Sequence, residues 1–119
     1  MSDLHAIAEN YIRLWNETES SRRERLLADG WAREATYIDP LASVSGHEQI
    51  NALIGSVQQR FPGFRFTLIK GPDGYGDRLR FGWSLGPASA AAPIEGSDVV
   101  TMHNGRIASV IGFLDKVPA

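Results

Sequence analysis

The sequence contains no cysteine, which excludes disulfide bonds, thiol nucleophiles and thiolate metal ligands. It also contains no apolar run long enough to cross a membrane. The N-terminal residues do not show the basic and apolar pattern of a signal peptide. We therefore expect a cytoplasmic protein that does not act at a membrane.

Basic charge is also scarce, because the formal net charge at pH 7 is −2. The densest basic cluster is formed by Arg22, Arg23 and Arg25, and the acidic residues Glu19 and Glu24 dilute it. Such a mixture is typical of a solvated helix face rather than of a nucleic-acid-binding surface. The sequence therefore predicts no nucleic acid as a partner.

Length and composition indicate one globular domain over residues 1–119, because a chain of 119 residues with 43% hydrophobic content can bury a real core. In the first half of the chain, apolar residues recur at helical spacing. Three helices are expected: residues 4–15, a short helix that ends at Gly30, and residues 46–60.

Each expected helix begins at residues that suit an N-cap. These are Ser2 or Asp3, then the capping-box pairs Ser21–Glu24 and Ser45–Glu48. His47, in the first turn of the third helix, is expected at the surface without a role.

The second half of the chain changes to the two-residue alternation of β-strands. Strands are expected around Tyr37 and at residues 64–68, 79–85, 94–102 and 107–114, with a turn at 71–74 and a hairpin at 103–106. The last strand is apolar on both sides, so it should be central or covered on both faces. This order predicts an α+β fold: a cone-shaped barrel in which three N-terminal helices pack on a curved, mainly antiparallel sheet. Such a cone usually holds a pocket.

The stretch of residues 34–49 contains the first candidate catalytic group. Ala35, Tyr37 and Asp39 share one side of a short strand, and Pro40 ends that strand. A carboxylate at a strand end beside an aromatic ring is a candidate general acid or base. Alternatively, Asp39 accepts hydrogen bonds from loop N–H groups ahead of the proline.

Asp98 and Tyr11 are further candidates. Asp98 shares a strand face with Ile94, Val100 and Met102. If that face points inward, burial raises the pKa of Asp98 and a neutral carboxyl group can donate a hydrogen bond. Alternatively, Asp98 faces water or is a charge that protects an edge strand. Tyr11 lies in the apolar stripe of the first helix, where a buried phenol needs a partner in the site, the backbone or water.

Four short blocks carry a family resemblance. They are Tyr-Ile-Arg-Leu at 11–14, Ala-Thr-Tyr-Ile-Asp-Pro at 35–40, Gly-His-Glu-Gln-Ile at 46–50, and Asp-Val-Val at 98–100 leading to Gly-Arg-Ile at 105–107. In this order and spacing they resemble the nuclear transport factor 2-like superfamily. They are most similar to the branch that contains ketosteroid isomerase and the SnoaL-like polyketide cyclases. The resemblance covers nearly the whole chain.

The resemblance implies roles for the three candidates. Tyr11 and Asp98 would form an oxyanion hole, and Asp39 would move a proton beside a carbonyl group, without a metal or an organic cofactor. The expected function is an isomerase or cyclase that acts on a small hydrophobic carbonyl compound. Residues expected to line the substrate cavity are Trp15, Tyr37, Trp83, Val100 and Phe113.

Several positions depart from the family pattern. Trp31 and Ile54 stand where the isomerase has two supporting tyrosines, and Tyr37 replaces a smaller side chain. Gly96 stands where epoxide hydrolases of this superfamily have an arginine, which argues against that activity. The alternatives to an enzyme are a non-catalytic small-molecule-binding module and a dimeric interaction domain. A homodimer through the outer sheet face is expected in either case.

Overall fold

The computed structural model describes residues 3–118, and this part of the chain forms three helices and six strands. The helices are α1 (Leu4–Asn16), α2 (Ser20–Gly30) and α3 (His47–Arg60). The strands are β1 (Trp31–Asp39), β2 (Ala42–Ser45), β3 (Phe64–Tyr75), β4 (Arg78–Pro87), β5 (Ile94–His103) and β6 (Arg106–Lys116). No helix among the described residues is long and apolar enough to span a bilayer.

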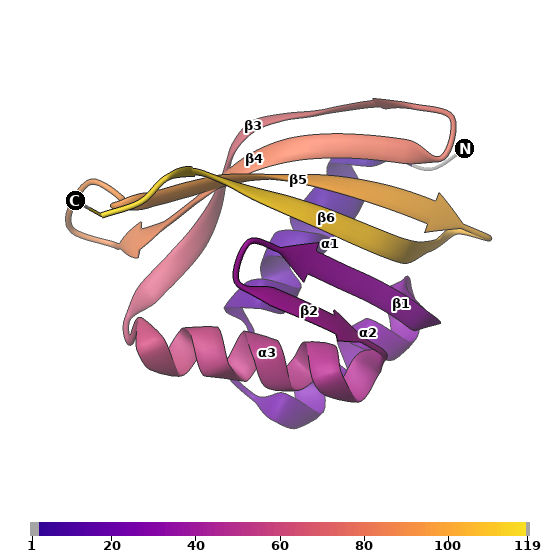
Figure 1. Ribbon diagram of the computed structural model, residues 1–119, viewed down its shortest axis with the longest axis horizontal. Helices are drawn as coiled ribbons and strands as arrows, with labels where there is room; N and C mark the ends of the chain where they lie inside the picture. Colours follow the sequence, from indigo (N-terminus) through magenta and orange to yellow (C-terminus); the bar gives the residue numbers. More distant parts are fainter. Residues whose placement is uncertain (1–2, 119) are drawn as a thin grey trace.

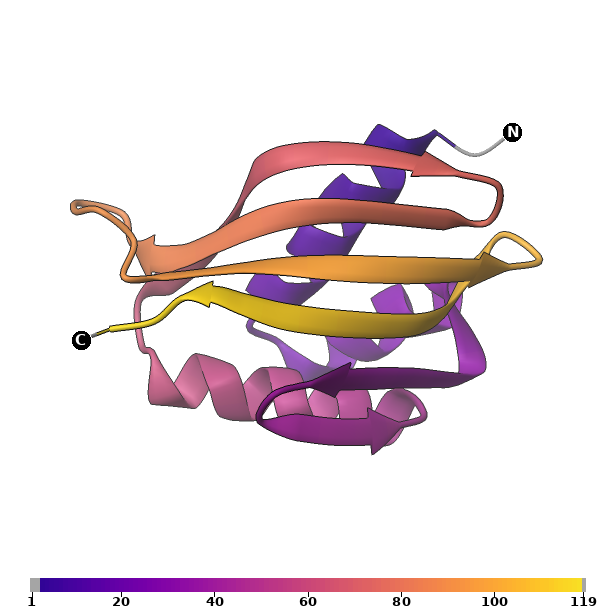
Figure 2. The ribbon, with the colours of Figure 1, turned by 45° about the horizontal axis from the view of Figure 1, so that its top comes forward.

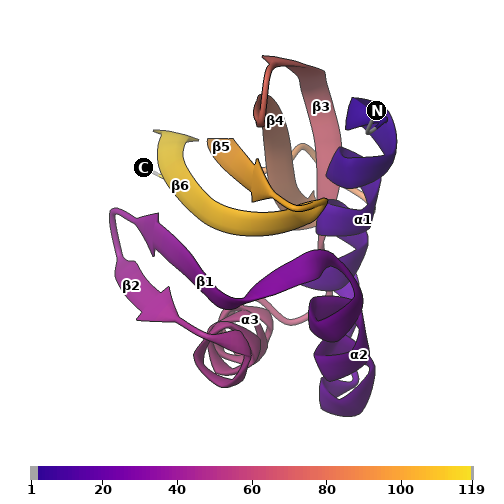
Figure 3. The ribbon, with the colours of Figure 1, turned by 90° about the vertical axis from the view of Figure 1, so that its right-hand side faces the viewer.

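The strands form one sheet with the order β2-β1-β6-β5-β4-β3 (Figures 1 and 2). Only the pair β1–β6 is parallel in this described sheet, and the other neighbours are antiparallel. The sheet curves without closing, with α1 beside β3 and α3 against β1 and β2 (Figure 3). The predicted α+β fold is therefore confirmed, and β6 is a central strand as expected.

Helix α1 forms because its apolar residues share one face, which packs into the core. Ala8, Tyr11, Leu14 and Trp15 are buried on that face. Asp3 is the N-cap, and its Oδ1 accepts a hydrogen bond from the His5 N–H at 3.0 Å. Ser2, the other candidate cap, lies outside the described residues.

Both predicted capping boxes are wrong. Helix α2 starts after Glu19, and helix α3 starts after Gly46, and at neither helix does the N-cap side chain accept a hydrogen bond from a backbone N–H of the first turn. Gly46 has a φ of +81°, a conformation that favours glycine. The Ser45 N–H instead donates to Gln49 Oε1 at 2.9 Å, so a residue in the first turn of the helix satisfies the backbone that precedes it.

Strand β3 continues through residues 71–74, where a turn was predicted. Asp73 lies opposite Arg80, and irregular register on either side of Lys70 keeps this segment paired with β4. Since β3 is an edge strand, Pro72 can lie in it without interrupting an inner ladder. The chain reverses later, between Tyr75 and Arg78.

Arg23 is buried, which contradicts the prediction of a solvated face, although Arg22 and Arg25 are exposed. Its guanidinium group donates to Asn51 Oδ1 at 2.5 Å, to Gln58 Oε1 at 3.1 Å and to the Glu17 carbonyl oxygen at 2.8 Å. These bonds connect α2 to α3 and to the end of α1. A buried cation is tolerated here because these three acceptors satisfy part of its hydrogen-bonding capacity.

His47 also has a structural role that was not expected. Its Nε2 lies 2.9 Å from the Ala32 carbonyl oxygen and 3.2 Å from that of Trp31. The imidazole therefore connects the start of α3 to the start of β1. Trp31 itself is buried in the core at 3% exposure.

Candidate active site

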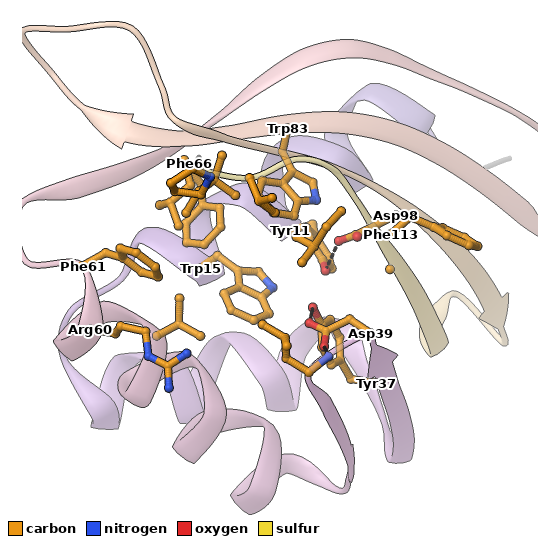
Figure 4. Close-up of a pocket in the computed structure, with 18 residues that line it drawn as sticks. Tyr11, Trp15, Tyr37, Asp39, Arg60, Phe61, Phe66, Trp83, Asp98 and Phe113 are labelled. Carbon is orange, nitrogen blue, oxygen red and sulfur yellow. Dashed lines mark hydrogen bonds between the residues drawn. The ribbon is translucent and has the colours of Figure 1, made fainter.

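A cavity of about 210 Å³ lies between the sheet and the helices (Figure 4). It is smaller than the roughly 300–1,000 Å³ typical of pockets for drug-sized ligands. Its walls are mainly apolar, and the aromatic residues among them are Tyr11, Trp15, Tyr37, Phe61, Phe66, Trp83 and Phe113. Leu41 and Arg60 also line the cavity and are exposed, so they lie at its opening. The shape and lining suit a small apolar molecule.

Tyr11, Asp39 and Asp98 meet in this cavity although they come from α1, β1 and β5. Asp98 points inward because the strand alternates, and the same face of β5 carries the buried residues Ile94 and Val100. The Tyr11 hydroxyl donates a hydrogen bond of 2.5 Å to Asp98 Oδ2 (Figure 4). Asp98 is only 2% exposed, so the alternatives of a solvated or edge-strand charge are excluded.

Burial raises the pKa of Asp98 to about 6, because the low-dielectric interior disfavours its charged form. The Tyr11 hydrogen bond opposes this rise, as does the Trp83 indole N–H, which lies near the carboxyl group without forming a hydrogen bond. The negative charge of Asp39 contributes a further increase. Burial and the Asp98 charge raise the pKa of Tyr11 well above its usual value, so this phenol keeps its proton at neutral pH.

Asp39 ends β1 and accepts two hydrogen bonds. The Tyr37 hydroxyl donates to its Oδ2 at 2.7 Å, and the Leu41 N–H donates to its Oδ1 at 2.8 Å. The loop contact expected of an aspartate before a proline is therefore present, and the same carboxylate lines the cavity. Burial, followed by the charge of Asp98, raises the pKa of Tyr37, which also remains protonated.

The structure places some, but not all, of the residues predicted to bind substrate on the wall of the cavity. Trp15, Tyr37 and Trp83 line the cavity. Val100 does not, because it lies one inward position beyond Asp98 and is completely buried in the core. Phe113 borders the cavity, but the residue is 54% exposed and its ring points away from the other aromatic rings (Figure 4).

Gly112 is a site residue that the sequence interpretation missed. It lies opposite Asp98 in the β5–β6 pair. A Cβ atom at this position would lie 2.8 Å from Asp98 Oδ1 and 3.3 Å from Asp39 Cβ. The glycine therefore keeps open the space between the two carboxyl groups. The available signal was a glycine inside an otherwise apolar strand, which often marks the close approach of a ligand.

Gly96 has a different role, because the Trp83 indole occupies the space beside it. A Cβ atom on Gly96 would overlap that ring. No arginine can project into the cavity from this position unless Trp83 moves, which agrees with the argument against an epoxide hydrolase. Among the described residues, no cluster of three or more histidine, cysteine, aspartate or glutamate side chains could hold a metal ion.

Comparison with known proteins relates this arrangement to one family. The sequence profile described as SnoaL-like domain matches residues 8–110. A solved structure of a candidate isomerase of the SnoaL-like family from Agrobacterium tumefaciens is 40% identical, with a TM-score of 0.91. That alignment covers 97% of this chain and 99% of the other. No match was found among curated protein sequences.

More distant structures share the fold. A candidate ketosteroid isomerase from Kribbella flavida is 17% identical with a TM-score of 0.71, over 98% of this chain and 80% of the other. A candidate SnoaL-like polyketide cyclase from Jannaschia is 15% identical with a TM-score of 0.71, over 97% of this chain and 90% of the other.

Proposed function

The chain belongs to the SnoaL-like domain family, and we propose that it is a cofactor-independent enzyme of proton transfer, an isomerase or cyclase. Its substrate would be a small hydrophobic carbonyl compound bound in the cone. One observation carries the proposal: a solvent-reachable carboxylate, Asp39, and a buried acid pair, Tyr11–Asp98, share one aromatic cavity.

In the proposed reaction, Asp39 removes a proton from the carbon next to the substrate carbonyl group. The electron pair of that C–H bond forms the enolate, whose negative charge develops on the oxygen. Hydrogen bonds from Tyr11 and a protonated Asp98 stabilise this charge, which is the largest contribution such a site can make. Asp39 then returns the proton to a second carbon, which completes an isomerisation. In a cyclisation the enolate carbon instead attacks a second carbonyl carbon of the same molecule; the π bond of that carbonyl group breaks, and its oxygen takes up the proton from Asp39.

The protonation state of Asp98 decides whether this pair can donate to an oxyanion. With Asp98 ionised, the Tyr11 proton is committed to Asp98 Oδ2. With Asp98 protonated, the carboxyl group and the phenol together have two protons to donate. With its pKa raised by burial to about 6, Asp98 is mostly ionised at pH 7 and roughly a tenth of it is protonated. This protonated fraction, which is far larger than that of an exposed aspartate, supports the proposed role.

A non-catalytic binding module is the second candidate, and one observation favours it. Both tyrosine hydroxyls in the cavity already donate to carboxylates, Tyr11 to Asp98 and Tyr37 to Asp39. These two hydrogen-bonded pairs would hold the cavity walls in place, and the cavity would then bind a ligand without catalysing a reaction. The fold alone does not decide between the two functions.

The deciding experiment is deuterium exchange at the carbon beside the carbonyl group of a small cyclic ketone in D₂O, followed by NMR. This reports enolisation whatever the final product is. We expect the wild type to accelerate exchange, and Asp39→Asn to lose about 10²–10⁴ of the acceleration because a positioned base is removed. If the wild type binds the ketone without accelerating exchange, the binding module is correct.

We also propose a homodimer through the outer sheet face. Ile38 on β1 and Ile111 on β6 are direct neighbours in the sheet and are 47% and 48% exposed. They point away from the cavity because their neighbours Tyr37 and Val110 are buried. Adjacent exposed isoleucines on neighbouring strands support an apolar contact with a second copy.

A further inference from the structure

Three buried polar atoms that line the cavity have no hydrogen-bond partner among the described residues. They are Trp15 Nε1, Trp83 Nε1 and Asp98 Oδ1. The three residues are 5%, 8% and 2% exposed, so bulk water does not reach these atoms freely. Leaving buried donors and acceptors unpaired is costly, and native proteins rarely do so without a functional reason.

The three atoms lie around the same acid pair. Figure 4 shows both indole nitrogen atoms turned toward Tyr11 and Asp98, one from α1 and the other from β4. Asp98 Oδ1 faces the gap above Gly112, because a Cβ there would come within 2.8 Å of it. The cavity thus has a polar end, while the remaining walls are mostly apolar, with Arg60 at the opening.

Whether each of these three atoms donates or accepts a hydrogen bond decides which ligand group it can bind. Two N–H groups can only donate, and an ionised carboxylate oxygen can only accept. A hydroxyl group matches this set, since it offers one proton and two lone pairs. An ammonium group would satisfy the carboxylate but leave both indoles unpaired, and a ligand carboxylate would be repelled by Asp39 and Asp98.

We propose that Trp15 and Trp83 donate hydrogen bonds to a ligand oxygen. The preferred ligand is an apolar ring compound with a phenol or enol hydroxyl group, and this hydroxyl donates a hydrogen bond to Asp98 Oδ1. This inference deepens the proposed function and rests on it, because the enol is the species that proton removal beside a carbonyl would form.

The test compares 2-naphthol with naphthalene, which differ only in the hydroxyl group, by equilibrium dialysis at neutral pH. We expect the wild type to bind 2-naphthol about tenfold more tightly, the value of one good hydrogen bond in a water-poor site. Naphthalene is the more hydrophobic compound, so hydrophobicity alone would produce the opposite order. Trp83→Phe keeps a planar ring without the N–H, and it should lose most of the preference while still binding naphthalene.

Phe61→Leu is the matched control, because Phe61 lines the cavity but carries no polar atom. This variant should weaken the binding of both ligands to a similar extent and leave the ratio of the two affinities unchanged. If Trp83→Phe does not fold, as judged by circular dichroism, Trp15→Phe makes the same test.

The outcomes separate this inference from the proposed function. A wild type that shows no preference for 2-naphthol, or a preference that survives in both tryptophan variants, overturns the inference. If the protein accelerates ketone exchange but shows no preference for 2-naphthol, the inference is overturned and the proposed function stands. A naphthol preference without ketone exchange would overturn the proposed enzyme and leave the inference intact, while binding of neither compound would overturn the inference regardless of exchange.

Discussion

Gly112 lies directly opposite Asp98 on the neighbouring strand, and its missing side chain leaves Asp98 Oδ1 open to the cavity. A β-strand interior normally disfavours glycine, because it loses more backbone entropy on folding than other residues and packs no side chain. Here the glycine borders both Asp39 and Asp98, and a larger residue would fill the space between their two carboxyl groups.

Gly112→Ala should therefore block the polar end of the cavity. The added methyl group would lie within 3.3 Å of both aspartate side chains, and we expect the affinity for 2-naphthol to fall at least about tenfold, the effect of losing one good hydrogen bond. Gly30→Ala is the control, since a Cβ there meets nothing within 4 Å. Unchanged naphthol binding by Gly112→Ala would show that the space between the aspartates is not used.

The pH dependence of stability should report Asp98. Because burial raises its folded pKa to about 6, above the unfolded value of about 3.9, its protonated form is favoured by folding. Its stabilising contribution is fully present below about pH 4 and is lost as the pH rises through about 6. At about 1.4 kcal/mol per pKa unit, the loss is on the order of 3 kcal/mol.

Asp98→Asn removes this titration while keeping the shape. The free energy of unfolding of the variant, measured by urea denaturation, should depend less on pH between 4 and 7 than that of the wild type. At pH 7 the variant should be as stable as the wild type or more stable, because no charge is buried. Parallel curves for the two proteins across this range would contradict the raised pKa.

Neighbouring arginines on α2 should differ in their contributions to stability. Arg23→Ala leaves Asn51 and Gln58 without their buried donor, so we expect a loss of about 2–4 kcal/mol in the free energy of unfolding. Arg22→Ala should change stability by less than about 0.5 kcal/mol, because its contact with Glu19 is exposed. Urea denaturation measures both, and equal effects would contradict the structural role of Arg23.

The homodimer can be tested by light scattering after size-exclusion chromatography. We expect the wild type to elute as a dimer and Ile111→Glu to elute as a monomer, because a charge would be placed in the apolar contact. Tyr75→Glu is the control, since Tyr75 is 78% exposed but lies at the end of β3 next to the turn. A monomeric wild type would remove the proposed contact between the outer faces.

Local periodicity was sufficient to predict most of the architecture. The stripe of α1, the alternation of β5 and the stop at Pro40 each depend on residues a few positions apart, and such spacings are visible in the sequence. The same alternation predicted that Asp98 shares a face with Ile94, and the family resemblance connected it with Tyr11. These predictions succeeded because one buried face constrains a whole helix or strand.

The tertiary structure decided which residues meet. The exposure of Arg22 and the burial of Arg23 follow from the acceptors that α3 and the end of α1 supply, and no helical pattern on α2 contains them. Val100 has the same inward orientation as Asp98, yet only Asp98 reaches the cavity. The register of β5 and β6 places Gly112 opposite Asp98, and packing turns two indole N–H groups toward them. Such relations depend on distances between segments remote in sequence, which local spacing does not determine.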